Sequence, residues 1–369
     1  MKNLLSKKVL YVYSGKLRKD AIGIDLVVKK QIDALVNSGC KVFLISRGVY
    51  KHNLVFNLSL PITPALLFSF FPARYYYNAQ YRFFSFLGSL VLAFFHFDFL
   101  VTWSGQGLAM LKVAKKKKIR SFLNCQSSHK KIYTRDDYLW PYIKLSQIQA
   151  EYKIADFLLL PSNFSKSTFL SEGFKKNTLV EIGRGVDLSR FFSGLKKSQP
   201  IRVVFFGSVT ERKGIFQALR AWKLADLKDS EFLVIGNIPK EIFHEVLSFS
   251  APNIRFLGFQ KYPEKYLSTS HIQILPTLFE GMAKTLIEGS ACGLVTLTTK
   301  NSGFPILDGI NGFYIDRENI DEYAKKLTLL ANDRKLLNFM GKKSEQYVKQ
   351  YLTWEQFQQK FISGILFNI

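Results

Sequence analysis

Short apolar runs alternate with amphipathic stretches along this chain. Val9 to Gly15 reads as a strand and a turn, residues 24–37 have apolar positions at helical spacing, and residues 41–46 form a second apolar run. Buried parallel strands are almost continuously apolar, whereas the helices that cover them repeat every 3.6 residues. This beginning predicts an α/β protein with a doubly wound parallel sheet.

The second half of the chain repeats the alternation. A polar segment at 195–200 separates the halves, and 369 residues are enough for two domains. We therefore expect a first domain at 1–195, a second at 196–350 and a terminal helix at 351–369. The pattern predicts further strands at 202–206, 231–235, 253–259, 271–276 and 294–299, a helix that ends at Leu227, and two helical stretches between 319 and 350.

Residues 83–101 form an apolar run close to the length of a membrane span. His96 and Asp98 interrupt it, and the run divides into a helix at 84–95, a short turn and a strand at 99–103. We therefore predict no span here. The aromatic and basic residues before it have two open interpretations, a membrane-contact surface or an aromatic core with exposed arginines. They are Phe70, Phe71, Arg74, Tyr75, Tyr76, Tyr77, Tyr81 and Arg82.

The formal net charge is +24, and the first half of the chain carries most of it. Residues 1–200 contain 31 lysines and arginines against 11 acidic residues, whereas residues 201–369 contain 21 against 17. A basic half indicates an anionic partner, which is a lipid headgroup, a nucleic acid or an acidic glycan. General solubility is the plain alternative. No DNA- or RNA-binding motif accompanies the charge, so a nucleic-acid-binding protein is the least favoured reading.

Three other features bound the class of protein. Lys115–Lys118 follow a helix expected at 107–114, where cations favour the helix dipole, so a solvated helix end competes with an anionic lipid site. The three cysteines lack metal spacing and fit a reducing cytosol. The N-terminus has no long apolar core or small-residue cleavage site, and we interpret it as a basic lead into the first strand.

Two carboxylates eight positions apart mark the most informative segment, which runs from Pro276 to Gly293. The apolar strand at 271–276 leads into Glu280-Gly281, a small-residue helix carries Glu288, and another strand follows. The helix N-terminus of such a βαβ unit offers free N–H groups to an anion. Carboxylates at the strand end and along the helix can bracket a sugar-phosphate held there.

This segment resembles the signature of the retaining GT-B glycosyltransferases of family 4, the glycosyl transferases group 1. Further landmarks stand in the family's order: Ala155-Asp156, Pro161-Ser162, Gly185-Val186-Asp187 with Phe191, and a glycine-pair turn at 308–312. The resemblance implies two Rossmann-like domains facing each other across a cleft. It also implies an acceptor-binding first domain, a nucleotide-sugar-binding second domain, and a terminal helix that crosses back to the first.

The resemblance assigns the donor site to the second domain. Lys213 would contact the diphosphate, with Arg212 beside it. The family often carries an arginine where this chain has Ser208, after Gly207, so one phosphate clamp is missing. Backbone N–H groups of Met282, Ala283, Lys284 and Thr285 would hold phosphates, with a possible contact from the Lys284 side chain. Glu288 would accept ribose hydroxyls, Glu280 would hold donor-sugar hydroxyls, and Phe259 also belongs to the donor-binding set.

First-domain candidates are fewer. His129 matches the family's cleft histidine approximately, and an ordinary loop histidine is the alternative. Gly23 fits the N-terminal glycine turn, although the neighbouring glycine is replaced by Ile22. The adjacent Asp136 and Asp137 suit a solvated pair better than a metal site. The resemblance implies no cofactor and no metal, and retention by same-face attack, in which the leaving phosphate takes the acceptor's proton and no protein nucleophile is needed.

The sequence thus predicts a transferase that moves a sugar from a UDP- or GDP-sugar to a glycan acceptor. The favoured acceptor is lipid-linked, as in lipopolysaccharide, capsule or other cell-surface polysaccharide synthesis. The basic first domain would then dock on the anionic inner face of the plasma membrane, so we expect a cytoplasmic, peripheral protein. Two alternatives stay open: a soluble acidic acceptor, and a GT-B binding subunit that has lost catalysis.

Overall fold

The computed structural model describes residues 4–17, 21, 23–60, 73–127, 145–196 and 200–368. The chain divides into two compact units, unit 1 with Met1–Gly183 and Phe357–Ile369, and unit 2 with Arg184–Gln356. The division follows Gly183, ahead of the boundary expected at 195. The last helix, α12 (Trp354–Leu366), brings the chain back into unit 1.

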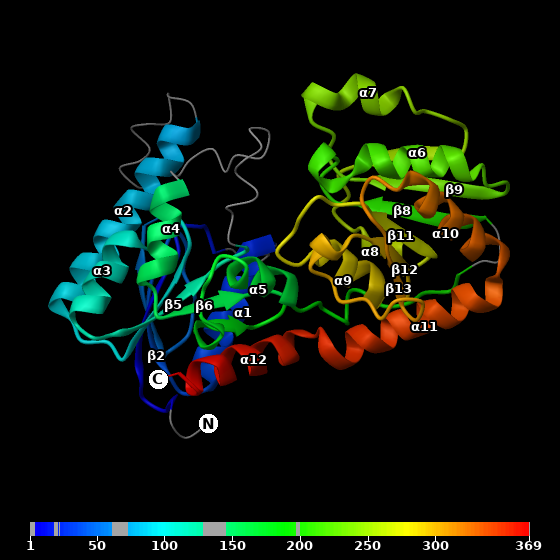
Figure 1. The fold of residues 1–369 in the computed structure, drawn as a ribbon. Helices are drawn as coiled ribbons and strands as arrows, with labels where there is room; N and C mark the ends of the chain where they lie inside the picture. Colours follow the sequence, from blue (N-terminus) through cyan, green and yellow to red (C-terminus); the bar gives the residue numbers. More distant parts are fainter. Residues whose placement is uncertain are drawn as a thin grey trace. The chain divides into compact units, whose positions relative to one another are not determined.

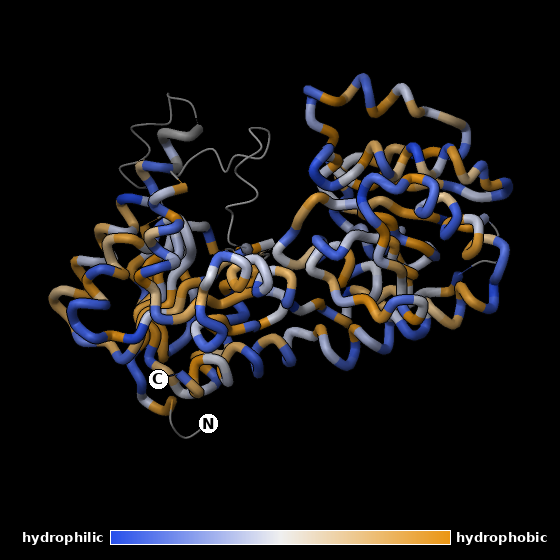
Figure 2. The backbone as a smooth tube through the Cα atoms, in the orientation of Figure 1, coloured by the Kyte–Doolittle hydropathy of each residue, from blue (hydrophilic) through white to orange (hydrophobic). Residues whose placement is uncertain are grey.

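Unit 1 is built on a seven-stranded sheet with the order β3-β2-β1-β4-β5-β6-β7, and all its strand pairs are parallel. The strand order reverses between β1 and β4, so this is a doubly wound sheet. The central strands β1, β4, β5 and β6 are mainly apolar (Figure 2), and all of their residues are buried except the first residue of β1 and of β5. Their bounds are β1 Lys8–Val12, β2 Lys41–Ser46, β3 Val55–Ser59, β4 Phe99–Trp103, β5 Arg120–Asn124, β6 Phe157–Leu160 and β7 Leu179–Glu181.

Helices cover both faces of this sheet. Helices α2, α3, α4 and α5 bury side chains in one shared core, in which the ring centroids of Phe169 on α5 and Tyr152 on α4 lie 4.9 Å apart. None of the buried residues of α1 belongs to that core. Helix α12 contacts α1, where the Gln358 side chain donates to the Lys30 carbonyl oxygen at 3.0 Å. The bounds are α1 Gly23–Asn37, α2 Ala73–Phe94, α3 Leu108–Lys116, α4 Leu145–Ile154 and α5 Asn163–Leu170.

Unit 2 holds a six-stranded parallel sheet with the order β10-β9-β8-β11-β12-β13. Its order reverses between β8 and β11, and ligands of such sheets bind beyond the carboxyl ends of the strands at that point. The strands are β8 Ile201–Phe206, β9 Ser230–Ile235, β10 Ile254–Gly258, β11 Ile272–Leu275, β12 Val295–Thr298 and β13 Gly312–Tyr314. The main helices are α6 Ile215–Ala225, α7 Phe243–Leu247, α8 Glu264–Leu267, α9 Lys284–Ala291, α10 Ile320–Asn332 and α11 Arg334–Tyr351.

The expected fold class is confirmed by these two parallel sheets. One boundary is wrong: the helix expected at 84–95 already begins at Ala73 and ends at Phe94. The turn and the strand at 99–103 follow as expected. Among the described helices, none is long and apolar enough to cross a membrane. Phe70 and Phe71 lie outside the described residues, as do the side chains of Arg74, Tyr75 and Tyr77.

A buried carboxylate organises one loop of unit 1. Glu151 in α4 accepts backbone N–H groups of Gly105, Gly107 and Leu108 at 2.5, 2.9 and 3.1 Å, which satisfies donors at the start of α3. Burial raises the pKa of Glu151 to about 7, although these hydrogen bonds act in the opposite direction. The loop therefore rests on a carboxyl group that titrates near neutral pH.

We expect Glu151→Gln to change how stability depends on pH. Because the folded-state pKa is raised above the unfolded value, the stability from Glu151 is fully present below that unfolded value and is lost as the pH rises through about 7. The Tm of the wild type should therefore fall relative to that of the glutamine variant between pH 5 and 8, as measured by thermal melts at matched ionic strength. Parallel Tm profiles for the two proteins would contradict this assignment.

Candidate functional site

Three glycines shape the carboxyl edge of the unit 2 sheet. Gly207 follows β8 with φ +137°, and an added Cβ there would lie 3.5 Å from the end of the Lys213 side chain and 3.6 Å from Thr285. A Cβ on Gly236 would lie 1.8 Å from the Gly207 oxygen, and one on Gly214 would lie 2.1 Å from the Pro276 oxygen. Only glycine permits such close approach of three backbone segments, and the approach brings Lys213 beside the start of α9.

Two cations converge on one carboxylate at this edge. The Glu280 Oε1 atom lies 2.8 Å from Arg212 Nη1 and 3.0 Å from Lys213 Nζ. Arg212 also donates to the Phe279 carbonyl oxygen at 2.7 Å, and its guanidinium lies over the Phe279 ring. Arg212 therefore points into the cluster. Ser208, at the position where an arginine is usual, is exposed.

The charge balance of this cluster is set by its two cations. Burial by itself raises the pKa of the Glu280 carboxyl, but the charges and hydrogen bonds of Lys213 and Arg212 outweigh burial, and the net shift is downward. Glu280 is therefore a carboxylate at neutral pH. Together the three groups carry one net positive charge, which suits an anionic ligand.

The start of α9 adds hydrogen-bond donors to the same place. Its N-cap residue Ala283 makes no side-chain cap, which leaves the first turn open to a ligand. The N–H of Ala283 itself already donates to the Ser302 carbonyl oxygen at 2.9 Å. The Thr285 hydroxyl is buried, and it has no hydrogen-bond partner within the described part of the chain. A buried hydroxyl without a partner is costly, so this one indicates a polar ligand.

Glu288 lies one turn further along α9 and is 6% exposed. Its Oε1 atom lies 3.0 Å from Lys284 Nζ, an i,i+4 pair. Burial raises the pKa of Glu288, and the Lys284 charge and hydrogen bond reduce that rise. Lys284 thus contacts the second carboxylate, whereas the sequence had suggested a phosphate contact for it.

The structure describes one of the two first-domain candidates. His129, with Asp136 and Asp137, lies outside the described residues. Gly23 begins α1 with φ +58°, which suits the glycine turn expected there.

Phe259, another predicted donor-site residue, belongs to unit 2, where it follows β10 and is 64% exposed. Among the described residues, no group of three or more His, Cys, Asp or Glu side chains could hold a metal ion.

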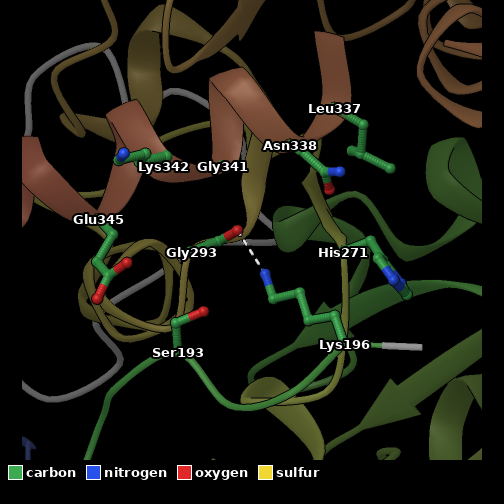
Figure 3. A pocket seen from close by; sticks show the side chains of 9 residues that line it. All are labelled: Ser193, Lys196, His271, Gly293, Leu337, Asn338, Gly341, Lys342 and Glu345. Carbon is green, nitrogen blue, oxygen red and sulfur yellow. Dashed lines mark hydrogen bonds between the residues drawn. The ribbon is translucent and has the colours of Figure 1, made fainter. Parts of the chain in front are cut away.

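A cavity of about 160 Å³ lies at the opposite edge of the unit 2 sheet, away from the cluster (Figure 3). Lys196 reaches across it and donates to the Gly293 carbonyl oxygen at 2.6 Å. Burial lowers the pKa of Lys196 to about 8. This contact ties the segment before β8 to the α9–β12 turn, and none of the predicted site residues lines the cavity.

Sequence reasoning missed the groups outside the predicted site that hold the cluster in place. Asn301 and Ser302 accept N–H groups of Glu280 and Ala283 through their carbonyl oxygens. Arg317 donates to the carbonyl oxygen of Glu211. Backbone acceptors have no residue signature, and Arg317 stands in a polar loop where an arginine is unremarkable, so no pattern in the sequence points to them.

Comparison with known proteins identifies the family of unit 2. Residues 188–347 match the model of the glycosyl transferases group 1. Unit 2 is therefore a group 1 glycosyl transferase domain. The predicted resemblance to the glycosyl transferases group 1 is thus confirmed for unit 2.

Relatives of the group 1 domain include a glycosyltransferase of capsular polysaccharide biosynthesis and a transferase named for a diphospho-undecaprenol-linked sugar. The chain is 22% identical over 169 residues to the capsular polysaccharide biosynthesis glycosyltransferase CapM of Staphylococcus aureus, a match that spans 42% of this chain and 44% of that protein. It is 24% identical over 209 residues to the N,N'-diacetylbacillosaminyl-diphospho-undecaprenol alpha-1,3-N-acetylgalactosaminyltransferase of Campylobacter jejuni, over 51% and 55% of the two chains. The matches thus span about half of these relatives.

Solved structures extend the likeness to both units. HepE of Anabaena, in complex with UDP-glucose, superposes with a TM-score of 0.69 at 11% identity and covers 97% of this chain and 99% of its own. At that identity the likeness establishes the GT-B fold alone. It includes unit 1, which lies outside the family match.

We expect Lys284→Met to raise the pKa of Glu288 further, because the opposing charge is removed. A raised carboxyl pKa means that stability is lost as the pH rises, so the loss of Tm between pH 5 and 8 should be larger in Lys284→Met than in the wild type. Breaking a largely buried pair should cost about 1–3 kcal/mol at pH 8, reduced from the fully buried case by the exposure of Lys284.

Thermal melts of Lys284→Met and of Lys284→Met combined with Glu288→Gln measure this effect. The double variant should lose the additional pH dependence, because its side chain 288 does not titrate. Equal pH dependence in the single and double variants would show that Glu288 is not the group responsible.

Proposed function

We propose that this protein transfers a sugar from a nucleotide-sugar donor to a glycan acceptor. The observation that carries the proposal is the convergence of Arg212 and Lys213 on Glu280 beside the open start of α9. The group 1 domain supports it, and neighbours of the same fold are solved with UDP and UDP-glucose.

The donor diphosphate would lie against Lys213 and the first turn of α9. Negative charge grows on the phosphate oxygens as the glycosidic bond breaks, and a fixed ammonium and oriented N–H groups stabilise that charge without reorganisation. The Thr285 hydroxyl gives one further donor. The Lys213 side chain is 12% exposed, so its charge is only weakly screened by water.

The two carboxylates would hold the two ends of the donor. Glu288, deep along α9, would accept hydroxyls of the ribose, and Glu280 would accept hydroxyls of the transferred sugar. Arg212 and Lys213 keep Glu280 ionised and therefore an acceptor only. We infer retention of configuration by same-face attack, with the departing phosphate as the base, from the resemblance to the retaining family 4 transferases. This attack needs no protein nucleophile, and Arg212 and Lys213 already engage the Glu280 carboxylate.

A lipid-linked acceptor is our preferred substrate, because unit 1 carries an apolar and basic surface. Phe86, Leu90 and Phe94 follow one another at i,i+4 spacing along α2 and are 58%, 38% and 80% exposed. The Lys117 ammonium donates to the Leu92 and Ala93 carbonyl oxygens at 2.7 and 2.6 Å, which joins the end of α3 to the end of α2 (Figure 1).

The exposed lysines at the end of α3 therefore lie near the end of α2, which carries the exposed Phe94. Lys115, Lys116 and Lys118 are all exposed. Apolar side chains next to lysines are the composition of surfaces that bind the headgroup region of anionic membranes. We propose that this surface docks the enzyme on the inner face of a membrane, where a lipid-linked glycan would be presented. A soluble acidic glycan is the alternative acceptor.

A thermal-shift panel with UDP, GDP, ADP, CMP and their sugars tests the donor site. A ligand that binds the folded state only raises Tm according to its concentration over its Kd. We expect one nucleotide family to raise the Tm of the wild type, and expect Glu288→Ala to abolish that rise. Arg255→Ala is the matched control, because Arg255 is 54% exposed on the sheet edge and should leave the shift unchanged.

The outcomes of the panel separate the alternatives. No shift with any nucleotide would contradict the donor site. A shift without release of nucleoside diphosphate from the matching nucleotide-sugar, in the presence of extracted membrane lipid, would favour a binding subunit that has lost catalysis.

Sedimentation with vesicles tests the membrane surface. We expect binding to vesicles with anionic lipid, weaker binding at high salt, and none to zwitterionic vesicles. Lys115→Gln with Lys116→Gln should reduce the affinity about thirtyfold, at about 1 kcal/mol for each lysine. Phe86→Ser with Phe94→Ser should reduce it by at least about tenfold.

The matched control is Phe339→Ser with Lys343→Gln on α11, an exposed phenylalanine and lysine that contact each other in unit 2. If this control weakens vesicle binding as much as the α2 and α3 variants do, the proposed surface is wrong. Binding by none of the proteins would favour the soluble acceptor.

A further inference from the structure

The short turn Glu211–Lys213 carries both cations of the donor cluster, and its own backbone is only a single 3₁₀ turn. Such a short turn has little intrinsic stability, so other parts of the chain have to fix its position. On one side, the Leu278 N–H and the Thr277 hydroxyl donate to the Arg212 carbonyl oxygen at 2.8 and 3.2 Å. These contacts come from the segment after β11.

Arg317 holds the other side of the turn. Its Nη2 atom donates to the Glu211 carbonyl oxygen at 2.9 Å across 106 residues of sequence. The side chain is 13% exposed, although it belongs to the polar loop between β13 and α10. The Glu211 carbonyl immediately precedes Arg212, so this hydrogen bond acts directly on the backbone that carries the two cations.

The guanidinium is itself fixed by two neighbours. Its Nη1 atom pairs with Glu318, and its Nη2 atom also lies 3.3 Å from the Gln217 side-chain oxygen. Gln217 in turn donates to Glu318 Oε2 at 3.2 Å, which closes a ring of three side chains. The planar fork of arginine can make these contacts at once, and the single ammonium of lysine cannot.

This ring of three side chains should contribute little to the stability of the fold. The Glu318 side chain is 65% exposed, and exposed ion pairs contribute little. The Nε atom of Arg317 is buried and has no hydrogen-bond partner among the described residues, which carries a cost. What the arrangement does accomplish is orientation, since it directs one N–H of Arg317 at the Glu211 carbonyl.

We propose that Arg317 is a positioning residue for the donor diphosphate, acting through the Glu211 carbonyl on Arg212 and Lys213. The inference rests on the proposed function, because it names what orients the phosphate-binding cations of that site. Arg317 touches neither the substrate nor Glu280 in this role. Arg317 instead fixes the position of Lys213 before the diphosphate binds. Less side-chain and backbone entropy is therefore lost on binding.

A double-mutant cycle on the full chain tests this inference. The probe is UDP, GDP or ADP, whichever gives the largest thermal shift, together with the matching nucleoside monophosphate, and affinities are measured by calorimetry. We expect Arg317→Ala to weaken the diphosphate about tenfold, the effect of losing one well-placed hydrogen bond, and the monophosphate much less. Arg317→Lys should give an intermediate loss, and Arg255→Ala should give none.

The decisive result is whether the loss of diphosphate affinity caused by Arg317→Ala depends on the presence of Lys213. In a Lys213→Ala background, Arg317→Ala should cost little further affinity, because the side chain that it positions is gone. Equal losses in both backgrounds, or equal losses for diphosphate and monophosphate, would overturn the role of Arg317, as would an unchanged affinity. If the wild type binds no nucleotide while its Tm is normal, the proposed function fails and this inference fails with it.

Should Arg317→Ala fail to fold, Gln217→Leu gives a second variant, because it removes one of the contacts that orient the guanidinium. It is expected to give a smaller loss in the same direction, again dependent on Lys213. A loss that persists after Lys213→Ala would contradict the inference.

Discussion

The donor cluster of unit 2 depends on one electrostatic balance, the Glu280 carboxylate, which is 17% exposed and is shared by Arg212 and Lys213. A carboxylate in that position is tolerable only because the two cations offset its desolvation, and the pKa of Glu280 is lowered as a result. The cations are in turn held close together by a carboxylate of opposite charge. Any anionic ligand entering the cluster meets donors whose positions are already set.

Backbone geometry makes this balance possible. Gly214 lets the turn of the two cations approach the Pro276 oxygen, and Gly236 lets β9 approach the Gly207 oxygen. Side chains at either position would separate the ends of β8, β9 and β11. The strand order of the parallel sheet reverses between β8 and β11, and loops that are distant in the sequence meet at that edge. The chemistry of the cluster depends on this arrangement of the sheet.

Unit 1 uses buried polar groups differently. Glu151 satisfies the donors at the start of α3, so that the loop after β4 keeps one conformation. On the outside of the same unit, the Lys117 ammonium joins the ends of α2 and α3. This contact holds the α2 end that carries the exposed Phe94 next to the lysines at the end of α3.

The sequence by itself determined the elements and their class. Apolar runs and helical spacing are local properties, so strands such as β1 and β8 and the fold class could be predicted. The spacing of eight positions between Glu280 and Glu288 likewise marked both as candidate site residues. The start of α2 was missed because aromatic residues at 73–83 carry no clear helical start signal. Only the tertiary structure decided the partners: that Arg212 faces Glu280, that Lys284 pairs with Glu288, and that Arg317 reaches Glu211. Packing and the direction of each side chain decide which residues far apart in the chain become partners. Local sequence patterns predict neither of these.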